Sequence, residues 1–210
     1  MFKNYFKTTI RNLWRNKTYS FLNIFGLAVG VACAALISVW VEDEVNFDRN
    51  YEKRNYLYKV FQNQSFEEEI STMRATSGPL ANALKTEIPG IKNAARLSFN
   101  ANFKQLFSFN NKMINEQGYY ADSSAFSMLM LPFVYGRADN AFKQVHSIVI
   151  SESTSKKLSN NTDPTGKTLK VNNEQEYLIT GVFKDLPQNS TLHFQWLAPF
   201  EVFEANKRLA

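Results

Sequence analysis

Hydrophobic and polar residues are distributed unevenly along the chain, and the longest uncharged stretch lies near its beginning. Residues 21–41, FLNIFGLAVGVACAALISVWV, carry hydrophilic side chains only at Asn23 and Ser38. As a helix this stretch would rise about 31 Å, which matches the roughly 30 Å hydrocarbon core of a bilayer. The pattern therefore predicts a transmembrane helix over residues 21–41.

A cleaved signal peptide is the alternative interpretation, because VACAA at 31–35 resembles a small-residue processing site. Signal peptides normally have an apolar region of about 7–15 residues. Here the apolar run continues past that site to Trp40, a residue type typical of membrane interfaces. Gly30 stands where lipoprotein signals usually carry Leu, which disfavours lipidation of Cys33. We prefer the retained span, and a mature chain starting near residue 33 would contradict it.

Small residues recur at four-residue intervals inside this run, at Gly26, Gly30 and Ala34. Small residues on one face let a second membrane helix approach closely. These three positions are therefore the candidate helix-packing face. The alternative is that Gly and Ala are simply common in membrane spans.

Residues 1–20 form a second patterned segment, predicted to be an amphipathic helix on the cytoplasmic membrane surface. Docking to a cytoplasmic partner is the alternative. The candidate contacts to the membrane surface or a partner are Lys7, Arg11, Trp14 and Arg15. The apolar side consists of Phe2, Tyr5, Phe6, Ile10, Leu13 and Trp14, and the basic side of Lys3, Lys7, Arg11 and Arg15.

Residues 42–210 alternate short strand and helix patterns without regular βαβ spacing, which predicts one α+β domain of mixed strands and short helices. Strands are expected at 56–64 and 147–151, and hairpins at 104–122 and 168–185 that turn at Asn110-Asn111 and Asn172-Asn173. Tyr119-Tyr120 is expected to begin a further strand. Helices are expected at 76–90, with Ser77 as cap, at 122–131, capped by Asp122 or Ser123, and after residue 151 through Lys157.

Charge is concentrated at the N-terminus. Residues 1–20 hold five basic residues and no acidic ones, whereas the other 19 basic residues are balanced by 19 acidic ones. Basic residues stay cytoplasmic next to a span, so we expect residues 42–210 outside the cytoplasm. Without a basic patch on its body, the chain is not expected to bind nucleic acid.

The sequence contains no convincing catalytic, cofactor or metal motif. TGKT at 165–168 lacks the Gly that a phosphate loop requires, since that position is Asn161. His146 and His193 have no ligand spacing, SES at 151–153 suits a helix cap, and EEE at 67–69 suits a solvated loop. Cys33 is the only cysteine, so no intrachain disulfide can form. We therefore expect no enzyme, and no cofactor on this chain.

Five motifs follow one another along the second part of the chain: SGPLANALKTEIPGIKNAARL (77–97), GYYADSSAF (118–126), SIVISESTSKKL (147–158), DPTGKTLKV (163–171) and YLITGVFKDLPQNSTLHF (177–194). In this order they resemble the extracytoplasmic core domain of FtsX-like, MacB-type ABC transporter permeases. The short basic helix, the span and EDEVNFDRNY at 42–51 also resemble the start of these proteins. SNNTDP lacks the Phe-Gly usual before Asp-Pro, and no second apolar run follows, so the chain resembles the N-terminal part of a permease.

The resemblance implies a subunit of the bacterial inner membrane with a cytoplasmic N-terminus and a periplasmic domain at 42–210. A separate cytoplasmic ATPase would bind ATP and Mg²⁺ and move this domain, driving efflux, lipoprotein release or a related process. Lys7, Arg11, Trp14 and Arg15 would then contact the ATPase or the membrane lipid. Further implied partners are a second permease, in a homo- or heterodimer, and an extracytoplasmic protein or lipoprotein. The alternative is a free-standing, membrane-anchored binding or adaptor domain.

Overall fold

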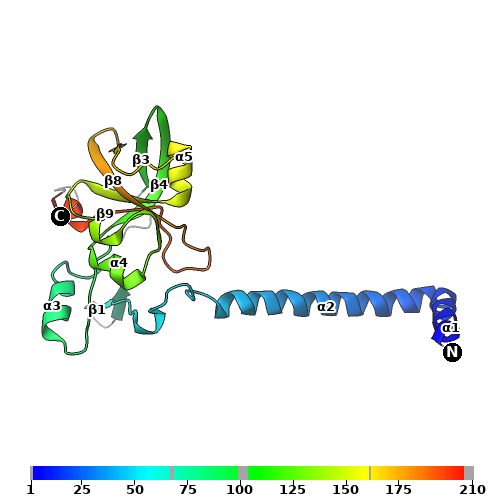
Figure 1. Cartoon of the computed structure of the whole chain (residues 1–210). Helices are drawn as coiled ribbons and strands as arrows, with labels where there is room; N and C mark the ends of the chain where they lie inside the picture. Colours follow the sequence, from blue (N-terminus) through cyan, green and yellow to red (C-terminus); the bar gives the residue numbers. More distant parts are fainter. Residues whose placement is uncertain (1, 67–68, 99–103, 161, 206–210) are drawn as a thin grey trace. The chain divides into compact units, whose positions relative to one another are not determined.

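The computed structural model describes residues 2–66, 69–98, 104–160 and 162–205, except the side chains of residues 2 and 66. The chain forms two units, Met1–Phe47 and Asp48–Ala210. The first unit consists of helices α1, Phe2–Arg15, and α2, Lys17–Val45, which meet at Asn16 (Figure 1). At 29 residues, α2 extends the predicted 21–41 span at both ends.

The second unit is an α+β domain, as the sequence predicts. Strands and short helices are interleaved along its sequence (Figure 1). The strands are β1 Gln62–Phe66, β2 Glu69–Met73, β3 Lys104–Phe109, β4 Lys112–Ala121, β5 Phe133–Gly136, β6 Ser147–Ser151, β7 Thr168–Val171, β8 Gln175–Phe183 and β9 Trp196–Pro199. The helices are α3 Leu80–Glu87, α4 Ser124–Leu129, α5 Glu152–Ser159 and α6 Phe200–Ala205, with 3₁₀ turns at Arg54–Tyr56 and Ala138–Asn140.

A closed ring of strands forms the centre of this domain. The 7-stranded sheet has the order β5-β8-β6-β9-β4-β3-β7, and β7 also pairs with β8, which closes the ring. Strand β5 lies outside the ring and pairs with the end of β8. Closure satisfies the backbone hydrogen bonds that an open sheet would leave at its edges, so the ring is a small barrel. Strands β1 and β2 form a separate 2-stranded sheet.

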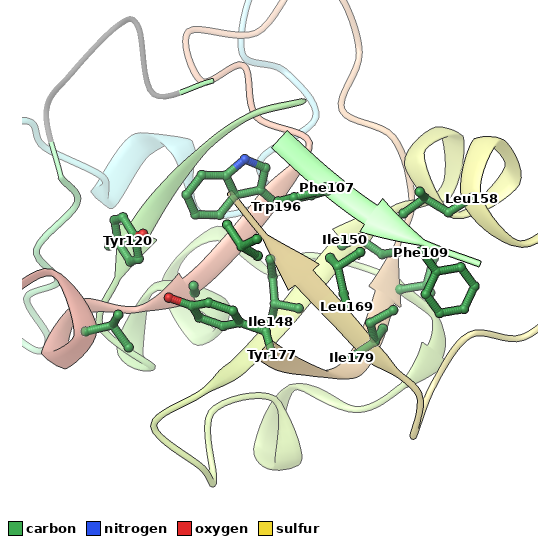
Figure 2. Packing of buried hydrophobic residues seen from close by; sticks show 14 of the residues in the cluster. Phe107, Phe109, Tyr120, Ile148, Ile150, Leu158, Leu169, Tyr177, Ile179 and Trp196 are labelled. Atoms are coloured by element: carbon green, nitrogen blue, oxygen red, sulfur yellow. The ribbon is translucent and has the colours of Figure 1, made fainter. Parts of the chain in front are cut away.

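The barrel interior is filled by apolar side chains from every strand of the ring (Figure 2). Alternate residues of β6 point to opposite sides, so Ile148 and Ile150 join the interior while Val149 joins a second cluster around α4. Trp196 of β9 is the largest fully buried side chain. Its ring lies 5.3 Å from that of Tyr120 and 6.0 Å from that of Phe107.

Both predicted hairpin turns are confirmed. Asn110 and Asn111 connect β3 to β4 with φ values of 44° and 63°. Asn172 and Asn173 connect β7 to β8 with φ values of 51° and 59°. Asn tolerates this left-handed conformation better than most residues, which explains why the paired Asn positions predict the turns.

Several local predictions differ from the structure in their bounds or their caps. Strand β1 begins at Gln62 rather than at residue 56, and residues 57–61 pair with no described strand. Tyr119 and Tyr120 do not begin a strand but continue β4. Neither Asp122 nor Ser123 caps α4 through its side chain. Asp122 instead accepts a hydrogen bond from the Arg96 amide at 2.7 Å.

The helix expected at 76–90 is also shorter than predicted, at both ends. Helix α3 covers only Leu80–Glu87, and the side chain of Ser77 does not cap it. The Ser77 carbonyl oxygen accepts a hydrogen bond from the Leu80 amide instead. Pro79, with φ −68°, precedes the first helical residue, in keeping with the restricted φ of proline.

Candidate functional site

The candidate contact residues of the N-terminal helix lie on an exposed surface of α1. Lys7, Arg11 and Trp14 line one surface depression together with Asn4, Thr8 and Ile10. Spacings of three and four residues place these side chains on one side of a helix. Arg15 follows in the last turn of α1 and does not line the depression.

Trp14 is 69% exposed and lies beside positive charge. The Nζ atom of Lys17 is 5.4 Å from the centre of its ring, within cation–π range. An exposed indole beside a cation suits a membrane interface or an acidic protein surface. This geometry agrees with the amphipathic pattern of the sequence, but the partner of this surface stays a prediction.

The candidate helix-packing residues lie within α2, none of whose side chains is buried in the chain. A Cβ atom added at Gly26 or Gly30 would meet no atom within 4 Å. The carbonyl oxygen of Ala34 accepts a hydrogen bond from the Ser38 hydroxyl at 2.9 Å. Helix α2 is long and apolar enough to cross a bilayer. Its packing against another span stays a prediction.

Sequence reasoning missed a cluster just after α2. Asp48 and Tyr51 contact residues 189–191, the loop that leads into β9. The Tyr51 and Ser190 hydroxyls share a hydrogen bond of 2.8 Å, and both residues are buried. The only signal in the sequence is that both segments lie in the pieces that resemble the permease family, EDEVNFDRNY and YLITGVFKDLPQNSTLHF.

The TGKT segment does not form a phosphate-binding loop. The Gly166 amide donates to the Ile179 carbonyl oxygen at 2.8 Å, and the Lys167 amide donates to that of Pro164 at 3.1 Å. The Thr165 amide donates to the Asp163 carboxylate at 2.9 Å. These amides are therefore satisfied within the protein, whereas a phosphate loop would direct them at its ligand. Asn161 lies outside the described residues.

The other candidate chemical groups have structural roles. The Ser151 hydroxyl accepts a hydrogen bond from the Thr154 amide and caps α5, as predicted for SES. His146 packs edge-on against Tyr177 with ring centres 5.5 Å apart. Among the described residues no group of three His, Cys, Asp or Glu side chains could bind a metal. Of EEE at 67–69, Glu67 and Glu68 lie outside the described residues.

Burial and hydrogen bonding shift the pKa values of three groups inside the domain, Tyr120, Tyr177 and Arg96. Burial raises the pKa of the Tyr120 and Tyr177 phenols, so both stay neutral at physiological pH. The hydrogen bond to Asp122 raises the pKa of Arg96, which keeps its charge. Each of these shifts favours the protonation state that the group ordinarily has at neutral pH.

Comparison with known proteins assigns the domain. Residues 20–208 match the model of the MacB-like periplasmic core domain. A domain of a permease protein from Porphyromonas gingivalis is 27% identical with a TM-score of 0.57, and the match covers 66% of this chain and 64% of that one. No curated protein sequence matches.

Two further solved structures are similar at lower identity. The periplasmic region of MacB from Actinobacillus actinomycetemcomitans is 21% identical with a TM-score of 0.47, over 60% of this chain and 56% of that one. The extracellular domain of the noncanonic ABC-type transporter YknZ from Gram-positive bacteria is 17% identical with a TM-score of 0.48, over 63% and 67%. The match thus spans less than two thirds of the first two structures. Because the family model matches nearly the whole sequence, the chain belongs to the family of MacB-like periplasmic core domains.

Proposed function

We propose that this chain is the membrane subunit of an ABC transporter. It couples ATP hydrolysis by a separate cytoplasmic ATPase to movement of the extracytoplasmic domain, Asp48–Ala210. The observation that carries this proposal is the joining of a MacB-like core domain to an apolar helix of 29 residues. At about 1.5 Å per residue, α2 measures about 44 Å, which exceeds a hydrocarbon core of roughly 30 Å.

The charge distribution supports a cytoplasmic N-terminus. Five basic residues precede the apolar run, while Glu42, Asp43 and Glu44 follow it directly. Basic residues next to a span are retained on the cytoplasmic side. Helix α1 would then lie at the inner face of the bacterial cytoplasmic membrane, with residues 42–210 in the periplasm or its extracytoplasmic equivalent.

Two surfaces of the first unit would contact partners. Lys7, Arg11, Trp14 and Arg15 would bind the ATPase or anionic lipid headgroups. The small-residue face of α2, Gly26, Gly30 and Ala34, would pack against another span. That span would belong to the same permease or to the second permease of a homo- or heterodimer. The extracytoplasmic domain would bind a protein or lipoprotein. ATP and Mg²⁺ would be held by the ATPase.

Co-purification tests the proposal. The natural protein, tagged and extracted in mild detergent, is expected to retain a cytoplasmic ATPase. Reversing the charge of two α1 residues, Lys7→Glu with Arg11→Glu, should reduce retention about tenfold or more, since each charged contact contributes roughly 1 kcal/mol. Lys170→Glu, on the exposed side of β7, is the matched control and should retain the ATPase.

The test also separates the alternative. If the natural protein retains no ATPase and its reading frame has no further spans, coupling is wrong. A free-standing, membrane-anchored adaptor domain would then be the better explanation. For the helix-packing face, Gly30→Ile should weaken association between spans. Ala32→Ile, on the opposite side of α2, should not.

A further inference from the structure

We propose that the barrel opens where β3 pairs with β7, and that the side chain of Asn172 is the lock that holds it closed there. We call this pairing and its side-chain contacts the β3–β7 seam, which consists of residues 105–108 and 170–173. Opening of the seam separates two strands and leaves the other pairings of the ring in place. This property of the barrel is independent of the proposed coupling function.

The seam is short and lies partly at the surface. Strand β3 pairs with β4 along its whole length, but among the described residues it pairs with β7 only at Phe107 and Ser108. The register between β6 and β9 is also short, yet every residue of those two strands is buried. In the seam, by contrast, Ser108 is half-buried and its partner Lys170 is exposed. Proteins open locally where pairing is short and the hydrogen bonds lie near solvent.

Asn172 extends this short register with its side chain. Its amide donates to the Leu106 carbonyl oxygen at 2.8 Å. The Leu106 amide donates in return to the Asn172 Oδ1 atom at 3.0 Å. In an ordinary antiparallel pair both acceptors are backbone carbonyl oxygens. Here the backbone of Asn172 has the turn conformation, with a φ of 51°, and its side-chain oxygen takes the place of the backbone one.

Two further side-chain contacts cross the seam from the same turn. The Asn172 Nδ2 atom donates to the Gln105 Oε1 atom, and Gln105 is buried. The Ser108 hydroxyl donates to the Asn173 Oδ1 atom at 3.2 Å. Both Asn residues are exposed, so water competes for each of these bonds. One turn therefore supplies the hydrogen bonds that the short register lacks, and it does so where they can be exchanged for water.

Opening of the seam uncovers part of the barrel interior. Phe107 and Val171 are register partners across the seam and belong to the apolar cluster of the interior (Figure 2). Val182 belongs to the same cluster, but it lies on β8 and pairs with Ile150 of β6. A thiol at position 171 would therefore become reactive when the seam opens, whereas a thiol at position 182 requires further unfolding.

Thiol labelling of the whole chain in lipid nanodiscs tests the proposal. Single cysteines are introduced as Val171→Cys or Val182→Cys in a Cys33→Ser background, since Cys33 is the only cysteine. The rate of modification by N-ethylmaleimide is followed by mass spectrometry. This rate follows the fraction of time for which a covered thiol is uncovered. We expect Val171→Cys to react at least about tenfold faster than Val182→Cys.

Asn172→Gly removes the lock and keeps the turn, because Gly adopts a positive φ readily. It should raise the labelling rate of Val171→Cys about tenfold or more, since the Leu106 amide loses its acceptor, and leave that of Val182→Cys within about twofold. Asn111→Gly is the matched control. Asn111 lies in the other hairpin turn with a φ of 63°, and its side chain makes no such contact with the described residues, so both rates should stay unchanged.

Asn172→Asp tests the side-chain oxygen itself. A carboxylate keeps the acceptor for the Leu106 amide, and the Gln105 side chain can rotate its amide group to donate to it. The labelling rate of Val171→Cys should therefore stay within about twofold of the background. Asn173→Gly removes only the contact with Ser108 and should raise this rate about threefold. It supplies the answer if Asn172→Gly does not fold.

Four results would overturn the proposal. Equal rates for the two thiols in the background would mean that the barrel opens only as a whole. Parallel acceleration of both thiols in both glycine variants would mean a general loss of stability. No acceleration in Asn172→Gly, or equal acceleration in Asn172→Asp, would exclude the side-chain oxygen as the lock. None of these measurements requires an ATPase, so the seam and the coupling function are tested separately.

Discussion

Gly118 of β4 is a position where the barrel leaves no room for a side chain. A Cβ atom there would lie 2.3 Å from both Cδ2 and the carbonyl oxygen of Trp196, and 2.5 Å from its Cε2. Trp196 is 1% exposed, and its indole N–H donates to the Glu116 carbonyl oxygen at 2.9 Å. The Trp196 carbonyl oxygen and its buried ring can move away only at a cost in free energy, because the surrounding core encloses both. Gly118→Ala therefore forces strands β4 and β9 apart.

The expected cost follows from two opposing effects. Overpacking a well-packed core costs about 1–3 kcal/mol, and contacts below 2.5 Å on backbone place this site at the upper end. Replacing Gly by Ala within a strand returns roughly 0.5–1 kcal/mol through the unfolded chain. We expect a net loss of about 2 kcal/mol in the free energy of unfolding. With a urea m-value of about 1–3 kcal/mol/M, the midpoint should fall by roughly 1 M.

Urea unfolding followed by Trp196 fluorescence measures this loss. The other two tryptophans, Trp14 and Trp40, are exposed in the first unit and are replaced by Phe to isolate the signal. Gly78→Ala is the matched control, because its Cβ would meet no atom within 4 Å, and it should change stability by less than about 0.5 kcal/mol. A Gly118→Ala variant as stable as the control would refute the packing argument.

Two further predictions concern charge. Arg96→Leu removes the bidentate ion pair with Asp122 and the contact with the Phe200 ring, whose centre is 4.1 Å from the guanidinium carbon. It should lower the free energy of unfolding in urea by about 2 kcal/mol. Arg137→Leu removes only an exposed ion pair with Asp139 and should lower it by less than about 0.5 kcal/mol. The raised pKa values of Tyr120 and Tyr177 favour the neutral phenol in the fold, so their contribution is complete below the unfolded pKa of about 10 and is lost as pH rises further. Absorbance at 295 nm should show these two ionising only as the domain unfolds, and a single titration step of all nine tyrosines near pH 10 would contradict this.

Features that depend on neighbouring residues were predictable. The apolar run at 21–41 predicts a long helix because its period and length are local properties. The two Asn pairs predict their turns because the left-handed conformation depends on the turn residues themselves. Strand β6 reads as an apolar strand because both of its faces are buried.

Features that depend on residues far away in the sequence could not be predicted. Strand β9 has only four residues, all buried, and it forms because β4 and β6 lie on either side of it. In the sequence, the position of Asp122 predicts a helix cap. In the structure, its carboxylate instead accepts hydrogen bonds from the amide and the guanidinium of Arg96. Residues 57–61 alternate like a strand, yet no described strand supplies the backbone groups that a ladder needs.

By itself, the sequence determined the apolar helix, the basic surface of α1, the α+β class and the family resemblance, since these follow from periodicity, charge and motif order. The tertiary structure alone decided that the barrel closes between β7 and β8 and that Asp48 meets Thr191 across 143 residues. Closure and long-range hydrogen bonds depend on which strands become neighbours, and this is set by burial of the whole core rather than by any local pattern.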